Sequence, residues 1–187
     1  EGQNIYRIWY DKPASYWEEA LPVGNGRIAA MVFGDPQLEQ IQLNEETVSA
    51  GSPYQNYNEE AKTALPEMRR LIFEGKYEEA QNMAATKILS QVGNEMPYQT
   101  VGRLNIRYQD HKKVNNYYRD LDISNAVAVT RYEVDGVEFT EETFASFTDQ
   151  LVIRHIKASK PGTINCELFF NTPMRDPKRS IYGKKGL

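Results

Sequence analysis

The carboxylates of this sequence are numerous but are not spaced for acid–base chemistry. Two carboxyl groups that cooperate in hydrolysis face each other across the scissile bond, about 5 to 9.5 Å apart. Glu45 and Glu46 are adjacent, and adjacent side chains of a strand point to opposite faces. Asp and Glu together number 26, so the prior that any given one is catalytic is low. We therefore predict no catalytic residue from local chemistry within this chain.

Two histidines and one cysteine are the other side chains that could act as a base, a nucleophile or a metal ligand. His111 lies beside Lys112 in a polar stretch and is predicted to be an exposed loop residue, whereas His155 is predicted to be half-buried in a strand. The two are too far apart for metal-ligand spacing. Cys166 is the only cysteine, which excludes a disulfide framework and a Cys-rich zinc site, and it is expected to be an inert buried thiol. No metal and no cofactor are expected.

The segment Gly24–Asn25–Gly26 is a tight-turn signal, because glycine and asparagine tolerate positive φ angles. It lacks the spacing of a phosphate loop and of a dinucleotide-binding loop. Asn25 and Arg27 have two interpretations. They could present an amide and a guanidinium group to a hydroxyl-rich ligand, or they could cap a neighbouring element, and the structural interpretation is favoured.

Aromatic side chains gather near the N-terminus, namely Tyr6, Trp9, Tyr10, Tyr16 and Trp17. Such clusters usually belong to a core, so we favour a strand and loop that cover the core. The alternative is a platform on which sugar rings stack.

Composition excludes several classes of protein. The chain has 187 residues, of which 40% are hydrophobic and 26% charged, as in one ordinary globular domain. Its net charge of −4 argues against a nucleic-acid partner, which would need a basic surface. No apolar run is long enough to span a membrane, and the polar N-terminal residues are not a signal peptide. The chain is thus expected to be a mature exported protein or a cytoplasmic fragment.

The hydrophobic pattern of the chain predicts both strands and helices as the elements that position these residues. Residues 28–34 form a short apolar run typical of a buried strand, and residues 39–43 alternate with period two, which predicts a hairpin. Residues 59–90 have a helical period and predict a helical hairpin, with Pro66 in a first turn and Gly75 between the helices. The predicted apolar positions are Ala61, Leu65, Met68 and Ile72 in one helix and Tyr77, Ala80, Ala84 and Ile88 in the other.

From about residue 104 onward the pattern is β. Asp135–Gly136 between valines predicts a type I′ turn that pairs Val134 with Val137, Tyr132 with Phe139, and Glu133 with Glu138 on a wet face. Further strands are predicted at 151–153 and 164–170. Many short strands with one helical insertion predict an antiparallel β-sandwich. Residues 181–187 resemble half of a hairpin, so the natural protein is expected to continue beyond this truncated end.

Charge is distributed unevenly along the chain. Residues 28–61 contain acids but neither lysine nor arginine, whereas residues 171–187 contain five lysines and arginines against one acid, Asp176. The acidic region is interpreted as a solvated face, and the two regions could attract each other or a partner domain.

Several motifs together resemble glycoside hydrolase family 95, whose members are chiefly α-L-fucosidases. The resemblance covers nearly the whole chain in order and rests on residues 8–14, 17–27, 41–47, 65–77, 96–99, 118–122 and 134–137. It implies that residues 1–187 are the N-terminal β-sandwich, of the super-sandwich type, of a larger inverting glycosidase. The catalytic (α/α)6 barrel of that family has no counterpart here, so no catalytic residue can be carried over, and the fragment alone is expected to be inactive.

The resemblance also implies a role and a set of positions. The domain is expected to pack on the catalytic barrel and shape the substrate cleft for fucosylated oligosaccharides. The candidate interface or substrate-wall residues are Trp17, Asn25, Arg27, Asn44 and Glu45. A bacterial protein, periplasmic or secreted, is the expected context.

Two departures from the family pattern leave the sugar open. Val48–Ser49–Ala50 replaces a common Leu-Trp pair, and Arg103 follows Gly102 where an acid is usual. A related specificity such as α-L-galactosidase is therefore an alternative. Two other functions remain open. One is a carbohydrate-binding module that uses the aromatic residues Trp9, Tyr10, Trp17 or Tyr54, and the other is a scaffold that serves only domain packing.

Overall fold

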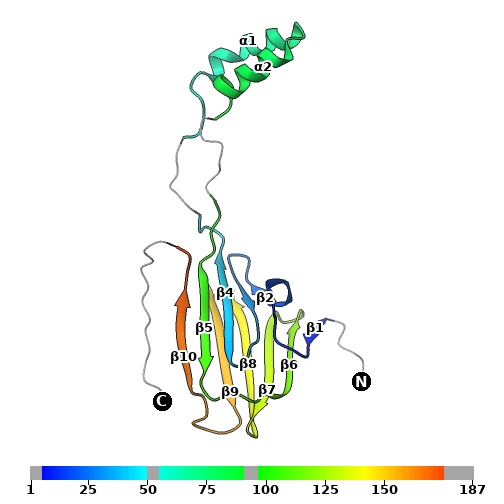
Figure 1. Cartoon of the computed structure of the whole chain (residues 1–187), viewed down its shortest axis with the longest axis vertical. Coiled ribbons are helices and arrows are strands. Elements are labelled where there is room, and N and C mark those ends of the chain that lie inside the picture. The colour runs from blue at the N-terminus through cyan, green and yellow to red at the C-terminus, as the bar shows by residue number, and fades with distance from the viewer. Residues whose placement is uncertain (1–5, 50–54, 91–96, 175–187) are drawn as a thin grey trace. The chain divides into compact units, whose positions relative to one another are not determined.

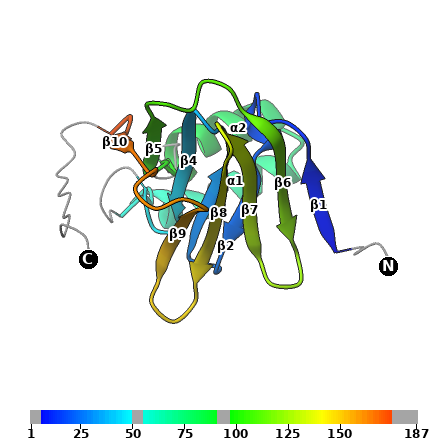
Figure 2. The ribbon, with the colours of Figure 1, turned by 90° about the horizontal axis from the view of Figure 1, so that it is seen from below.

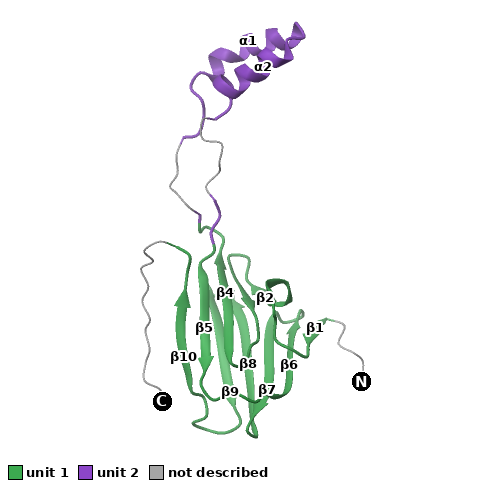
Figure 3. Ribbon diagram, in the orientation of Figure 1, with its two compact units in different colours: residues 1–48, 100–187 green, residues 49–99 purple. Residues whose placement is uncertain are grey.

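The computed structural model describes residues 6–49, 55–90 and 97–174 of the chain. It divides into two compact units, shown in Figure 3. Residues 1–48 and 100–187 form the first, which we call the sandwich unit. Residues 49–99 form the second, which we call the helical unit. Each unit is described by itself.

The sandwich unit consists of two antiparallel five-stranded sheets, which Figures 1 and 2 show as two layers. Sheet A has the order β1 (Arg7–Tyr10), β6 (Asn115–Asp122), β7 (Val127–Val134), β8 (Val137–Ser146) and β9 (Leu151–Ala158). Sheet B has the order β10 (Cys166–Asn171), β5 (Gly102–Tyr108), β4 (Leu38–Glu45), β3 (Ile28–Val32) and β2 (Leu21–Gly24). The predicted antiparallel sandwich is confirmed, as are the strands at 28–34, 39–43 and 151–153.

The core forms because alternate residues of each strand point between the sheets. Sheet B contributes Leu21, Ile41 and Ile106, and sheet A contributes Leu121 and Ala128, all of them buried. A second cluster of Tyr132, Val134 and Phe139 lies where β7 meets β8. The inner faces are therefore mainly apolar, apart from a few buried polar side chains such as Glu39 and Thr143, and the residues between them in sequence form the outward faces.

The hairpin between β7 and β8 has the predicted register. Asp135 has φ 48° and Gly136 has φ 77°, the two positive values that a type I′ turn requires. Val134 pairs with Val137, Tyr132 with Phe139, and Glu133 with Glu138. The outward Glu133–Glu138 pair remains accessible to water, which lowers the repulsion between the like charges.

The helical unit contains α1 (Ala61–Phe73), α2 (Tyr77–Met83) and the π-helix η2 (Ala84–Ile88), which confirms the predicted helical hairpin. Gly75, with φ +77°, separates the helices as predicted. Two details differ from the prediction. Pro66 lies inside α1 rather than in its first turn, and Ile72 and Tyr77 face outward while the unpredicted Leu71 is buried. Ala80 is buried as predicted.

The N-terminal aromatic residues are less buried than predicted. The structure places Tyr10 against the core, but Trp9 is 60% exposed, and Tyr6, Tyr16 and Trp17 are also more than half exposed. Trp9 lies in the edge strand β1, which has a neighbour on one side only, whereas Tyr16 and Trp17 lie at the short helix η1 (Trp17–Glu19), outside both sheets. The interpretation of this cluster as core-covering is therefore wrong for four of its five members.

Among the residues described here, no helix is long and apolar enough to cross a bilayer. The expected half-hairpin at 181–187 and most of the basic C-terminal region fall outside the described residues.

Candidate functional site

Asn25 organises the loop between β2 and β3. Its Oδ1 accepts hydrogen bonds from the backbone N–H groups of Arg27 (3.1 Å) and Ile28 (2.9 Å). Its Nδ2 donates to the backbone oxygen of Ser146 (2.8 Å) and to Gln150 Oε1 (3.3 Å). The amide therefore links sheet B to the β8–β9 turn of sheet A. All four contacts support the interpretation of Asn25 as a structural cap.

Arg27 and Glu45 form an ion pair next to this loop. Arg27 Nε donates to Glu45 Oε1 at 3.0 Å, and Glu45 Oε2 accepts from the backbone N–H (2.9 Å) and the hydroxyl (2.6 Å) of Thr47. The bonds from Thr47, followed by the bond from Arg27, hold the pKa of Glu45 below its ordinary value. Glu45 is thus a fixed carboxylate, which is suited to positioning rather than to donating a proton.

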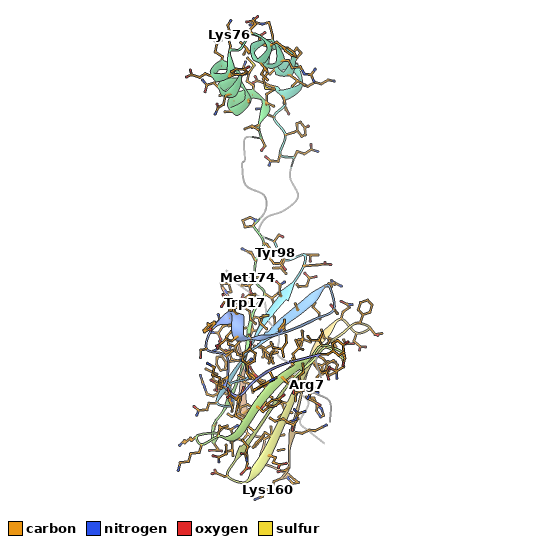
Figure 4. The ribbon with its side chains drawn as sticks, turned by 90° about the vertical axis from the view of Figure 1, so that its right-hand side faces the viewer. Arg7, Trp17, Lys76, Tyr98, Lys160 and Met174 are labelled. Atoms are coloured by element: carbon orange, nitrogen blue, oxygen red, sulfur yellow. The ribbon has the colours of Figure 1, made fainter. Side chains whose placement is uncertain are left out.

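The other two predicted positions lie elsewhere on the sandwich unit. Asn44 pairs with Ala29 and lies on the outward face of sheet B, because its neighbour Leu43 packs against the core. Trp17 lies in the short 3-10 helix η1 (Trp17–Glu19), 52% exposed, toward the end of the sandwich away from Lys160 (Figure 4). The structure brings Asn25, Arg27 and Glu45 together in one loop region. It does not bring all five residues into one pocket.

The structure also contains a charged cluster that sequence reasoning missed. Arg154 Nη2 pairs with Glu39 Oε2 at 2.7 Å and also with Glu141, while its Nη1 donates to Thr143 Oγ1 at 2.6 Å. Tyr132 donates its hydroxyl to Glu141 Oε1 at 2.6 Å. We call Glu39, Thr143, Glu141, Arg154 and Tyr132 the buried ion cluster. It joins β4 of sheet B to β7, β8 and β9 of sheet A.

The buried ion cluster is sealed from solvent. The exposed fractions of the Glu39, Glu141 and Arg154 side chains are 0%, 2% and 7%. Desolvation raises the pKa of Glu39 to about 7, against the lowering effect of Arg154, and the nearby Glu141 adds to the rise. Two carboxylates do face each other here, but Arg154 lies between them. Since no substrate can reach them, they cannot act as a hydrolytic pair.

Glu39 also corrects the interpretation of residues 28–61 as a solvated acidic face. Its Oε1 accepts hydrogen bonds from the backbone N–H groups of Gly34 (2.8 Å) and Gln40 (3.0 Å). The period-two pattern of β4 contained a signal for this burial, because Glu39 shares a face with Ile41 and Leu43.

Both histidines differ from their predicted environments. His111 is buried rather than exposed, stacks on Tyr108 with the ring centroids 4.4 Å apart, and has its Nδ1 3.0 Å from the Pro36 backbone oxygen. Burial lowers the pKa of His111. His155 is exposed rather than half-buried and lies 3.2 Å from Glu142. Neither therefore forms a nucleophile–base arrangement.

Cys166 is half-buried, and burial raises the pKa of its thiol, which makes it a poor nucleophile as expected. Within the described part of the chain, no three His, Cys, Asp or Glu side chains are close enough together to hold a metal ion.

Arg119 is a second buried cation that the sequence did not reveal. Its Nε and Nη1 donate to the backbone oxygens of Lys12 (2.8 Å) and Glu19 (2.7 Å), and its guanidinium lies 4.1 Å from the ring centre of Tyr10. Burial lowers its pKa. Arg119 therefore helps to fix the N-terminal segment that carries Trp17 to sheet A.

Comparison with known sequences identifies the family. Residues 8–186 match the model described as "Glycosyl hydrolase family 65, N-terminal domain". The chain belongs to this family. A glycosyl hydrolase N-terminal domain is what the motif resemblance implies, and this part of the prediction is confirmed. The match names family 65, so the assignment to family 95 stays a prediction.

Several curated proteins are similar to this glycosyl hydrolase domain. It is 37% identical over 180 residues to "Alpha-L-fucosidase 2" of Arabidopsis thaliana. This alignment covers 93% of the chain and 21% of the relative. It is 26% identical to "Probable alpha-fucosidase A" of Aspergillus niger and 24% identical to the protein of the same name from Aspergillus oryzae, each over 81% of the chain. The chain spans about a fifth of the length of these relatives.

Proposed function

We propose that this chain is the non-catalytic N-terminal sandwich of an α-L-fucosidase-like glycosidase. It packs on a helical (α/α)6 barrel supplied by another part of the polypeptide and forms one wall of the cleft for fucosylated oligosaccharides. The observation that carries the proposal is the sealing of Glu39 and Glu141 around Arg154, because these facing acids lie beyond the reach of substrate. The similarity to "Alpha-L-fucosidase 2" supports the type of enzyme.

The wall itself is assigned to the loop region of Asn25, Arg27 and Glu45. The Arg27–Glu45 pair is held by bonds to Thr47, and Asn25 fixes the loop to the opposite sheet. A preorganised polar surface of this kind suits a supporting role beside a sugar, because its geometry does not change when the sugar binds.

An α-L-fucosidase assay on this chain and on the full-length protein tests the placement of the chemistry. We expect turnover only with the full-length protein, and activity in the chain of 187 residues would overturn the proposal. The same assay with an α-L-galactoside decides between the two specificities.

A substitution tests the wall. Arg27→Gln in the full-length protein is expected to raise KM or lower kcat about tenfold, since it removes a charge-assisted hydrogen bond that holds the surface in place. Arg107→Gln is the matched control, because Arg107 is an exposed cation of sheet B paired with Glu167 at 2.7 Å. Equal effects of the two substitutions on KM and kcat would show that the loop region does not form part of the cleft.

One observation favours a second candidate, a carbohydrate-binding module. Trp9 is 60% exposed and stacks on Tyr118, with centroids 6.2 Å apart and planes at 22°. Tyr10 is not available, because Arg119 lies over its ring, and Tyr54 falls outside the described residues. Calorimetry with fucosylated oligosaccharide tests this function. Binding that Trp9→Ala abolishes would support it, and absence of heat would exclude it.

A further inference from the structure

The outward face of sheet B carries amide and guanidinium side chains in a row across three strands. Gln42 of β4 pairs with Arg103 of β5, and Arg103 pairs with Asn171 of β10. Side chains of directly paired residues lie on the same face with Cβ atoms about 4.5–5.5 Å apart. The three polar groups are therefore neighbours, although they are far apart in the sequence.

A cavity of about 290 Å³ lies at this row, lined in part by Gln42, Thr100, Arg103, Asn171 and Thr172. Small-molecule sites begin at about 300 Å³, so the cavity suits a single sugar residue rather than an oligosaccharide. It lies at the end of the sheet where β4 finishes and β5 begins.

Gly102 permits the close approach of β10 that shapes the cavity. Its φ is +138°, and a Cβ at this position would lie 2.4 Å from the backbone oxygen of Asn171 and 2.7 Å from the Phe170 ring. Any other residue would push the end of β10 away, so glycine places Asn171 beside Arg103.

Arg103 lacks a carboxylate partner among the described residues. Its Nη1 donates to Gln40 Oε1 at 3.2 Å, a neutral acceptor. The contrast is with Arg107 on the same strand and face, which pairs with Glu167 at 2.7 Å. A guanidinium group offers donors in a fork that matches a carboxylate, and most of that fork is unoccupied at Arg103.

The neighbours of Arg103 add further donors. Asn171 Oδ1 accepts from Asn105 Nδ2 at 3.0 Å, which leaves the NH₂ group of Asn171 to donate. Thr172 Oγ1 accepts from the backbone N–H of Met174 at 3.2 Å, which leaves its hydroxyl hydrogen to donate. A cation with two neutral donors forms an environment for an anionic oxygen.

Gln42 requires a hydrogen-bond donor from the ligand, whereas Arg103, Asn171 and Thr172 require an acceptor. Its Oε1 is buried and has no hydrogen-bond partner in the described structure. Such an acceptor costs free energy unless a donor reaches it. An anion alone has no donor, whereas a sugar hydroxyl donates to an acceptor of this kind.

We propose that this cavity binds a carboxylate-bearing sugar of the uronic acid class. The carboxylate pairs with Arg103 and accepts from Asn171 or Thr172, and a ring hydroxyl donates to Gln42 Oε1. Binding at this face involves no hydrolysis, so the inference does not depend on the proposed function.

Calorimetric titration of the chain with methyl glucuronide and with neutral methyl glucoside tests the proposal. We expect the glucuronide to bind at least about ten times more tightly, because a hydrogen-bonded charge pair has that effect. Arg103→Gln should remove the preference for the acid. Gln42→Leu should weaken both sugars and leave the preference intact.

Two controls separate the site from its surroundings. Arg107→Gln removes an exposed cation on the same face and should leave the affinity unchanged, and thermal unfolding of each variant reports whether it is folded. Acetate should bind at least about ten times more weakly than the glucuronide, because it offers no hydroxyl to Gln42. Equal affinity for glucuronide and glucoside, an equal loss in Arg107→Gln and Arg103→Gln, or acetate binding as tight as the glucuronide would each overturn the proposal.

Discussion

Replacement of Arg154 by methionine is the most decisive perturbation of the fold. In the native protein the guanidinium compensates Glu39 and Glu141, which have exposed fractions of 0% and 2%. Methionine preserves much of the volume but leaves both carboxylates without their cation. Breaking a buried pair in this way costs about 3–5 kcal/mol. We therefore expect Arg154→Met to lower the free energy of unfolding by about 3–5 kcal/mol at pH 7.

The same cluster predicts an unusual dependence of stability on pH. Burial raises the pKa of Glu39 to about 7, whereas its ordinary value is 4.5. Between these values the folded protein binds more protons than the unfolded chain, so stability falls as pH rises. The contribution is complete below about pH 4.5 and is lost as pH rises through about 7, and it amounts to about 3 kcal/mol. Accordingly, Arg154→Met should be less harmful at pH 5 than at pH 7.

Chemical denaturation followed by tryptophan fluorescence measures these effects. Both tryptophans of the chain, Trp9 and Trp17, lie in the sandwich unit, so the signal reports on this unit alone. Glu39→Gln should abolish the fall in stability between pH 5 and pH 7, whatever its absolute stability, because it has no titrating carboxyl. Arg107→Met is the matched control and should cost at most about 1 kcal/mol, as exposed pairs do.

Two results would refute this reasoning. One is an equal destabilisation by Arg154→Met and Arg107→Met, which would mean that burial adds nothing to the pair. The other is an identical pH dependence in the native protein and in Glu39→Gln, which would exclude Glu39 as the titrating group.

Three further pairs of substitutions probe other parts of the fold. Gly34→Ala should lower the free energy of unfolding by about 2 kcal/mol or more, because the residue has φ +75° and a Cβ would meet side chains at 2.8 Å. Gly26→Ala, at φ +93° in open space, should lower it less. Chemical denaturation measures both, and equal losses would contradict the role of crowding. Asn25→Ala should cost about 1–2 kcal/mol through loss of the loop cap, and Asn25→Asp, which keeps Oδ1, should cost less; the reverse order would count against the cap. Leu71→Ala should reduce helical circular dichroism while Ile72→Ala should not, since Leu71 is 4% and Ile72 41% exposed; an equal loss would contradict the observed face.

The local sequence was sufficient to predict strand pairing where the pairing depends on a turn of a few residues. The Asp135–Gly136 turn determined the register of β7 and β8 because only these residues adopt the required positive φ angles easily. The helical hairpin was predictable as a pair of helices with most of its buried face, since only Ile72 and Tyr77 of the predicted apolar positions are exposed. Ile72 and Leu71 lie on neighbouring stripes of one helix, and packing against the second helix selects Leu71.

The buried charges were missed for a different reason. Charged residues were assumed to face water, which is the rule for most of them. The alternation nevertheless placed Glu39 with Ile41 on the inner face of β4, and it placed Arg154 with Val152 and Ile156 on the inner face of β9. The sequence therefore contained the position of each charge, but not that the two strands would face each other. That information depends on the packing of the two sheets.

The same packing explains why the candidate site consists of positioning residues. A pair of acids works in hydrolysis only where substrate and water reach both of them. In this fold the facing acids, Glu39 and Glu141, join the two sheets through Arg154, and proton exchange there changes stability rather than catalysis. The polar groups that do reach the surface, Arg27 and Glu45 among them, are tied to each other and to the backbone. A rigid surface of this kind can orient a sugar, and under the proposed function the bond-breaking groups come from another part of the polypeptide.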